Sequence, residues 1–247
     1  MDIDVVLLPT HLQPSHLKRR VVVVFDVLRA TTTMAAALAA GVKEIRVFGD
    51  LGEASLAAGR HADAARRLLC GEENCLRPEG FDLGNSPGAF RRELHARRTM
   101  YMSTTNGTRA IVAAREAPVV LAGALANTSA VARAVVQRWA GMGVTLLCAG
   151  TGGAVAMEDV IGAGAVMAAL GRSFPISPDS DAALIARRLY EAAAHDLRTA
   201  LIESLGGRNV IAAGLLEDIA FAARLDALDV VGFVERQTLS VKPLRPD

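Results

Sequence analysis

The chain has 247 residues, of which 51% are hydrophobic and 21% are charged, as in ordinary soluble globular proteins. Its 27 basic and 26 acidic residues leave a net charge of +1, without the basic excess typical of proteins that bind nucleic acid. A chain of this length can bury a core without staples, and its three cysteines form no Cys-x-x-Cys pair that would indicate a zinc site.

The chain also lacks targeting and membrane signals. Residues 1–13 carry two acids and a short apolar run, without the basic region of a signal peptide. No apolar segment approaches the length of a membrane span. We therefore expect a cytoplasmic protein with neither a membrane nor a nucleic acid as partner.

Short apolar runs alternate with alanine-rich helical patterns along the chain. The expected strands are Val5–Leu8, Val21–Val27, Glu44–Phe48, Arg67–Cys70, Thr99–Ser103, Val119–Ala122, Val144–Cys148 and Val230–Glu235. The expected helices are Thr32–Ala40, Leu51–Arg66, Pro87–Ala96, Gly107–Arg115, Thr128–Ala140, Met157–Leu170, Asp179–Ala200, Gly207–Ala212 and Leu215–Arg224. Strands that are apolar on both faces and alternate with helices predict a three-layer α/β/α protein with a largely parallel or mixed sheet.

One boundary is expected at residues 173–181, where two prolines and several polar residues interrupt the pattern. Residues 1–175 would form the α/β core. Residues 176–247 would form a mostly helical part that packs on this core, as a cap or as the continuation of a single domain.

Polar and charged side chains gather in the loops that follow the expected strands. Ligands of open α/β sheets bind beyond the carboxyl ends of the strands, so these loops are expected to meet. Helix N-termini in such loops suit an anion, and Arg29 and Arg109 could each bind an anionic oxygen. Acids there would repel an anion unless a divalent cation intervened, and oxygen ligands favour Mg²⁺. These acids are Asp26, Glu72, Asp82, Glu158 and Asp159.

Each of these features also has a structural interpretation. Thr31, Thr32 and residues 104–106 could be ordinary helix N-caps. Asp26 could be an ion-pair partner of Arg29 and nothing more. The repetition of the same chemistry in several loops favours a functional site over these alternatives.

Other candidate groups carry less information. The glycines at 150–153 match neither GxxxxGK[ST] nor a complete GxGxxG, so they are weak evidence for a nucleotide. His11 and His16 flank a proline in an early loop and could reach the site. Cys148 ends an expected strand, but no histidine is evidently placed to activate it as a nucleophile.

Taken together, the polar loops resemble the 2-phosphosulfolactate phosphatase family (ComB-like). The strings that carry the resemblance are VVVVFDVLRATTT at 21–33, EGFDLGNSP at 79–87, STTNGTRAI at 103–111, MEDVIGAGAV at 157–166 and LLEDIAFAARLD at 215–226. The resemblance implies a Mg²⁺-dependent phosphatase that converts (R)-2-phospho-3-sulfolactate to (R)-3-sulfolactate and phosphate, on the route to coenzyme M. It also implies a cytoplasmic α/β/α protein of the family's own fold that forms a homo-oligomer, which we expect to be a dimer.

The family's motifs contain the candidate site residues, and their roles follow from their chemistry. The candidate catalytic residues are Asp26, Arg29, Asn106 and Arg109. The candidate substrate-binding residues are Thr31, Thr32, Asn85, Ser86, Thr104 and Thr105. The candidate Mg²⁺ ligands are Asp26, Glu72, Asp82, Glu158 and Asp159.

Several alternatives stay open at this point. A carboxylate could activate water or attack phosphorus itself. Haloacid-dehalogenase phosphatases carry a second aspartate two residues after their strand-end aspartate, whereas this chain has Leu28 there. Ala156, Gly162 and residues 230–232 depart from the family pattern and bear on the substrate, so another phosphorylated hydroxy acid is a second hypothesis. A non-catalytic anion-binding protein is a third.

Overall fold

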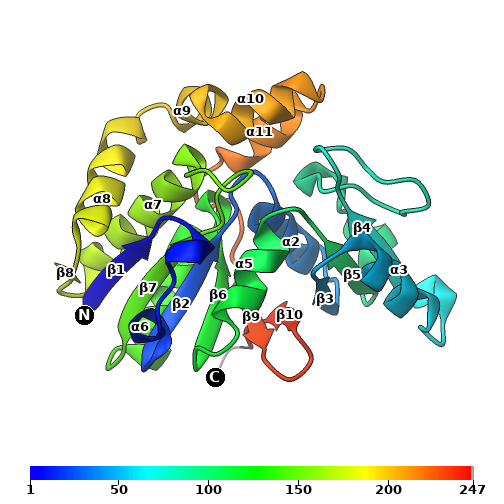
Figure 1. Cartoon of the computed structure of the whole chain (residues 1–247), viewed down its shortest axis with the longest axis horizontal. Coiled ribbons are helices and arrows are strands. Elements are labelled where there is room, and N and C mark those ends of the chain that lie inside the picture. Colours follow the sequence, from blue (N-terminus) through cyan, green and yellow to red (C-terminus); the bar gives the residue numbers. More distant parts are fainter. Residues whose placement is uncertain (246–247) are drawn as a thin grey trace.

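The structure is a computed structural model that describes residues 1–245. One mixed sheet runs through this part of the chain (Figure 1). It is 10-stranded, with the order β4-β5-β3-β10-β9-β6-β2-β7-β1-β8. The strands are β1 Asp2–Val6, β2 Arg20–Phe25, β3 Glu44–Phe48, β4 Arg67–Gly71, β5 Thr99–Ser103, β6 Val119–Gly123, β7 Gly143–Cys148, β8 Ser177–Pro178, β9 Gly232–Glu235 and β10 Ser240–Pro243.

Helices cover both faces of this sheet (Figure 1). The α-helices are α1 Pro14–Leu17, α2 Ala30–Ala39, α3 Leu51–Gly59, α4 Arg92–His95, α5 Gly107–Ala114, α6 Thr128–Trp139, α7 Met157–Ser173, α8 Asp181–Ala193, α9 Leu197–Glu203, α10 Leu205–Ala212 and α11 Leu216–Ala222. Short 3₁₀ helices are η1 Pro9–His11, η2 Ala64–Arg66, η3 Pro87–Ala89 and η4 Leu125–Asn127. Within residues 1–245, none of the helices is both long and apolar enough to cross a membrane.

The sheet consists of two parallel blocks joined by an antiparallel hairpin. Strands β4, β5 and β3 pair in parallel, and so do β6, β2, β7, β1 and β8. The hairpin β9–β10 lies between the blocks and pairs antiparallel with β6 on one side and β3 on the other. The predicted mixed α/β/α architecture is therefore confirmed, whereas β8 and β10 lacked an apolar run and were missed.

Strand β2 illustrates the three layers. Val21, Val23 and Phe25 belong to a core shared with α6 and α7. Val22 and Val24 point to the opposite face, into a core shared with α2 and α5. Because alternate side chains of a strand face opposite sides, a strand buried on both faces must be continuously apolar, as this one is.

Three predicted helices are divided or end early: the one expected over 87–96 is divided into η3 and α4, and an aspartate begins a new helix in the other two. The helix expected over 51–66 ends at Gly59, and Asp63 then caps η2 by accepting the N–H of Ala65. The helix expected over 179–200 divides into α8 and α9, since Asp196 accepts the N–H of Thr199. Aspartate favours such N-cap positions over helix interiors.

The segment after residue 175 adds strands to the same sheet as residues 1–175 and packs helices on it. Strand β8 pairs with β1, and α8 packs on α7 and β1. Strands β9 and β10 join the middle of the sheet, while α9, α10 and α11 form an arch at the top of Figure 1. The division at residue 175 stays a prediction, and residues 246–247 of its second part lie outside the described residues.

Gly164 permits the close packing of α7 on α8. A Cβ at this position would overlap the carbonyl oxygen of Ala186 and lie 2.6 Å from Cβ of Tyr190. We expect Gly164→Ala to lower the free energy of unfolding by about 1–3 kcal/mol, because overpacking forces the two helices apart. Thermal denaturation of the two proteins measures this difference.

Gly171, in the same helix, provides the matched control. Its nearest neighbour to an added Cβ is Ile176 Cδ1 at 3.4 Å, an ordinary contact. Gly171→Ala should leave stability unchanged or raise it by up to about 1 kcal/mol through helix propensity. Equal stability of the two alanine variants would contradict the proposed role of Gly164.

Candidate active site

A pocket of about 210 Å³ opens beside the loop that follows β2. Its walls come from the loops after β2, β4, β5 and β7 and from the start of α10. Several residues that the sequence singled out line it together, and these are Asp26, Arg29, Glu72, Asn85, Thr105 and Asn106. The pocket therefore combines loops from both parallel blocks of the sheet.

Helix α5 brings the two blocks together at this point. It follows β5 in one block but contacts β2 in the other as well as β3. A Cβ on Gly107, its first residue, would lie 2.6 Å from both Asp26 Oδ2 and Ala30 Cβ. Glycine is thus required for the start of α5 to approach the end of β2 this closely.

The loop after β2 is held by its own hydroxyl groups. Oδ1 of Asp26 accepts the N–H of Ala30 at 3.0 Å. The hydroxyl of Thr31 donates to the carbonyl oxygen of Asp26 at 2.9 Å, and that of Thr32 donates to the carbonyl oxygen of Val27 at 2.8 Å. Thr31 and Thr32 are fully buried, so the structure places their hydroxyls in the turn and not in the pocket wall.

Arg29 is paired with an acid that the sequence did not single out. Its Nη1 lies 2.6 Å from Oδ2 of Asp218, on α11, and also donates to Oγ of Ser86 at 3.3 Å. Its Nη2 donates to the carbonyl oxygen of Cys75 at 2.5 Å. The suggested pairing of Asp26 with Arg29 is therefore replaced by a pairing with Asp218.

Glu72 ties the loop after β4 to the loop after β5. Its Oε1 accepts both the N–H and the hydroxyl of Thr105, at 2.8 and 2.7 Å. Its Oε2 accepts the N–H of Cys75 at 2.9 Å. Glu72 thus lines the pocket, but its oxygens already take part in hydrogen bonds that shape it.

Two amide side chains complete the wall. Asn85 is buried, and its Oδ1 has no hydrogen-bond partner within residues 1–245. Asn106 precedes α5 at the N-cap position without making a side-chain cap bond. Both amides lie at the pocket and remain available to a ligand.

Three buried carboxylates lie close together, and one of them, Asp26, lines the pocket. Asp26, Glu158 and Asp159 are 6%, 1% and 2% exposed. Oδ1 of Asp159 accepts the N–H of Val27 at 2.8 Å, and its Oδ2 accepts the N–H of Gly150 at 3.0 Å. Asp159 thereby links the loops that follow β2 and β7.

Burial disfavours the charged forms of these acids. It raises the pKa of Asp26 to about 6, and the nearby charges of Glu72 and Glu158 add to this effect. Burial, followed by the charges of Asp26 and Glu158, raises the pKa of Asp159 well above its usual value. The pKa of Glu158 is raised mainly by burial. The cluster therefore favours binding of protons or of a cation.

Glu158 also touches the helical segment that closes the pocket. A Cβ on Gly206, in α10, would overlap its Oε1, so this close approach requires glycine. Its Oε2 is buried and has no hydrogen-bond partner within the described chain. An unpartnered buried carboxylate oxygen is a group that a cation could satisfy.

The oxygen donors fit a magnesium ion that shares its coordination with water and substrate. Within residues 1–245, no group of three or more His, Cys, Asp or Glu side chains is arranged to hold a metal by itself. Mg²⁺ commonly uses one or two carboxylates together with waters and substrate phosphate. Asp26 at the pocket and Glu158 with its unpartnered oxygen suit that kind of site.

Besides Thr31 and Thr32, three more predicted site residues do not line this pocket. Asp82 is exposed, and its Oδ2 accepts the N–H of Leu69 at 2.7 Å, beside β4. Thr104 is buried, and its hydroxyl accepts the N–H of Thr108 at 3.3 Å within the first turn of α5. Arg109 lines an adjoining pocket that shares Glu72 and Thr105 with the first one.

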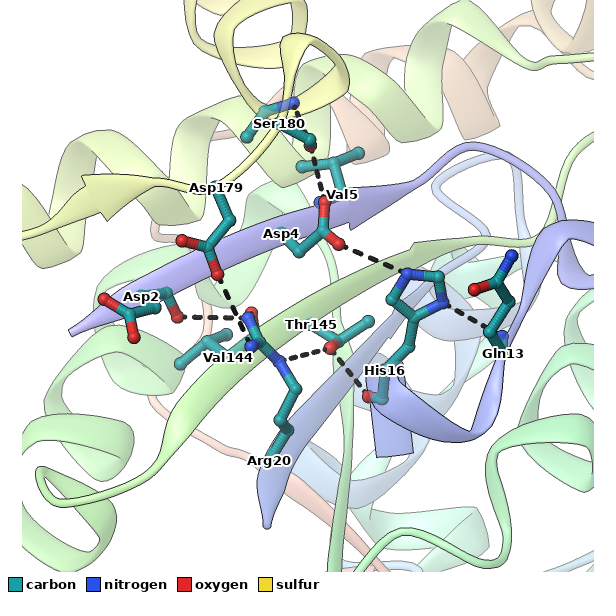
Figure 2. Close-up of polar contacts among 11 residues, drawn as sticks. Asp2, Asp4, Val5, Gln13, His16, Arg20, Val144, Thr145, Asp179 and Ser180 are labelled. Atoms are coloured by element: carbon teal, nitrogen blue, oxygen red, sulfur yellow. Dashed lines mark hydrogen bonds and ion pairs between the residues drawn. The ribbon is translucent and has the colours of Figure 1, made fainter. Parts of the chain in front are cut away.

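The early histidines lie away from this site. His16 belongs to a network around β1 that Figure 2 shows, with its Nε2 3.3 Å from Oδ2 of Asp4. Ser180 donates to Oδ1 of the same aspartate at 2.5 Å, which joins α8 to β1. Neither His11 nor His16 lines the pocket.

The cysteines are free, and Cys148 is not a nucleophile in this structure. It is fully buried at the end of β7. Burial raises the pKa of its thiol well above the usual value, and the charges of Asp159 and Glu158 raise it further. A thiol in this environment stays protonated.

Comparison with known proteins gives a consistent result. The model of the 2-phosphosulpholactate phosphatase family matches residues 6–237. A probable 2-phosphosulfolactate phosphatase of Synechococcus sp. (strain JA-3-3Ab) is 42% identical over 211 residues, which cover 85% of this chain and 86% of the relative. Another, of Carboxydothermus hydrogenoformans, is 36% identical over 231 residues, which cover 94% and 92%. The chain therefore belongs to the 2-phosphosulpholactate phosphatase family, a family of phosphoric monoester hydrolases.

Proposed function

We propose that this enzyme is a Mg²⁺-dependent phosphatase that hydrolyses (R)-2-phospho-3-sulfolactate to (R)-3-sulfolactate and phosphate, a step of coenzyme M biosynthesis. The family match and the names of the relatives support the substrate. The observation that carries the chemistry is one pocket lined by Arg29 together with Asp26 and Glu72. A cytoplasmic homodimer is part of the same proposal.

The residues of the pocket have different roles in binding a polyanionic substrate. Arg29 binds phosphoryl oxygens, and the amides of Asn85 and Asn106 orient the remainder of the substrate. Asp26 and Glu158 would hold Mg²⁺, which when bound neutralises negative charge on the phosphoryl oxygens.

The positions that depart from the family pattern do not argue for a different substrate. Ala156 is fully buried, and a Cβ on Gly162 would lie 2.8 Å from Cγ2 of Val27. Gly232 belongs to β9, where a Cβ would lie 2.7 Å from Cγ1 of Val241. These residues serve close packing and are not part of the pocket wall.

Phosphate release from 2-phosphosulfolactate is the direct test. We expect turnover with Mg²⁺, and loss of it on addition of EDTA with recovery when Mg²⁺ is restored. A panel of phosphate monoesters without a sulfonate should be hydrolysed at least 10-fold less efficiently. Absence of phosphate release in the presence of metal would overturn the proposal.

Asp26→Asn should remove activity without unfolding the protein. We expect kcat/KM to fall at least 100-fold, the order of magnitude for loss of a group that acts on the transition state. The pKa of Asp26 is raised from 3.8 to about 6, so the folded protein binds a proton more tightly than the unfolded chain does, and stability falls as pH rises through this window. At pH 7.5 without Mg²⁺, the Tm of the variant should therefore equal or exceed that of the parent.

Asp82→Asn is the matched control, since Asp82 lies in a family motif but is exposed beside β4. It should keep kcat/KM within about threefold of the parent. Activity that persists in Asp26→Asn, or that is lost equally in both variants, would contradict the roles assigned here.

Arg109→Ala should weaken substrate binding. Arg109 forms no ion pair within residues 1–245, and its pocket shares a wall with the first one. An unpaired cation beside the pocket attracts a polyanion, so we expect KM to rise about 5- to 10-fold with little change in kcat, and the effect to shrink at high salt.

Arg115→Ala controls for the loss of a positive charge from the same helix. Arg115 lies at the far end of α5 and is paired with Glu116 at 3.4 Å. Steady-state kinetics should give an unchanged KM for this variant. Identical KM values for both arginine variants would exclude a local role of Arg109.

A further inference from the structure

Arg29, Ser86 and Asp218 form a closed triangle of hydrogen bonds. Nη1 of Arg29 donates to Oδ2 of Asp218 at 2.6 Å and to Oγ of Ser86 at 3.3 Å. Oγ of Ser86 in turn donates to the same oxygen of Asp218 at 2.8 Å. A third contact, from Nη2 to the carbonyl oxygen of Cys75, fixes the plane of the guanidinium.

These contacts leave the Nε group of Arg29 without a hydrogen-bond partner within residues 1–245. An arginine side chain has five N–H donors. The three contacts involve Nη1 and Nη2, and the N–H of Nε makes no hydrogen bond within the described chain. A free guanidinium N–H can donate to an oxygen of a phosphoryl group. Arg29 lines the pocket, where such a group would bind.

Asp218 also balances the charge of Arg29. The two side chains are only 2% and 8% exposed, and an unpaired guanidinium is strongly disfavoured in such a place. Among the ion pairs of residues 1–245, none joins Arg29 to the pocket acids Asp26 and Glu72. The counter-ion of Arg29 is therefore Asp218 and neither of the acids that line the pocket.

The helical arch delivers this carboxylate to the site. Asp218 lies in the first turn of α11, which packs on α9, α10 and η3. Ser86 is the N-cap residue of η3, so the packing of α11 on η3 brings Asp218 to Ser86 and Arg29. The contact joins segments that are 189 residues apart in the chain.

We propose that Asp218 is the positioning residue for Arg29, which it holds so that the free N–H of Nε can reach the phosphoryl group of the substrate. Asp218 acts through Arg29 and does not itself touch the reacting atoms. The proposal rests on the proposed phosphatase function and deepens it, because it makes α11 part of the substrate-binding apparatus.

A double-mutant cycle tests this assignment. Asp218→Asn keeps the size and an acceptor oxygen but removes the charge, and we expect kcat/KM for phosphosulfolactate to fall at least 10-fold, mostly in kcat. In an Arg29→Ala background the same change should alter kcat/KM by less than about twofold, because a residue that acts only through Arg29 has nothing left to position. Multiplicative losses would overturn the proposal, as would full activity of Asp218→Asn.

Glu217→Gln is the matched control, since Glu217 is the exposed acid next to Asp218 in the same helical turn. It should leave kcat and KM unchanged. Ser86→Ala is a second test, which does not require the Asp218 variant to fold. It should lower kcat/KM about 3- to 10-fold. An unchanged kcat/KM would contradict a role for the Arg29–Ser86–Asp218 hydrogen bonds in catalysis.

Binding of inorganic phosphate separates this proposal from the proposed function. If the parent enzyme releases no phosphate from phosphosulfolactate, the phosphatase assignment fails, and the cycle is then measured as the Kd of phosphate by calorimetry. Non-additive weakening of phosphate binding by Arg29→Ala and Asp218→Asn would still support the positioning role. Additive or absent weakening would overturn it.

Discussion

The mutual repulsion of buried carboxylates is the constraint around which the site is organised. Asp26, Glu158 and Asp159 lie within reach of one another's charge and have little access to water. Burying charge is costly unless hydrogen bonds or a counter-ion compensate it. Backbone N–H groups stabilise Asp159 and Asp26 in part, and this ties the loops after β2 and β7 into one unit. The remaining excess of negative charge is what a divalent cation would relieve.

The positive charge of the site is kept separate from these acids. Arg29 follows Asp26 by three residues, yet its counter-ion is Asp218 on α11. Had the arginine paired with Asp26, the two charges would have cancelled and the pocket would have had little use for either a cation or an anion. The arch of α9 to α11, at the top of Figure 1, therefore has a chemical role at the site.

The sequence predicts what depends on local pattern. The apolar run at 21–25 identified β2 because both faces of that strand are buried, whereas the short polar strand β10 left no such signal. Loop order predicted that Asp26 would meet the loops after β4 and β5, because strand ends of an α/β sheet converge. Which way a loop side chain turns is decided by tertiary contacts, so Asp82 was expected in the pocket but lies outside it. Asp218 lies in the string at 215–226 that carries the family resemblance, but it was given no role because nothing local links a helical acid to a distant arginine.

The claim that the buried carboxylates form a cation site is tested most directly by counting the protons that Mg²⁺ displaces. At pH 6, about half of the Asp26 carboxyl groups should be protonated, since its pKa is about 6. Calorimetric titration with Mg²⁺ in two buffers of different ionisation enthalpy should therefore reveal proton release, and Asp26→Asn should reduce it. Mg²⁺ binding without proton release, or no binding at all, would contradict a cation site at these acids.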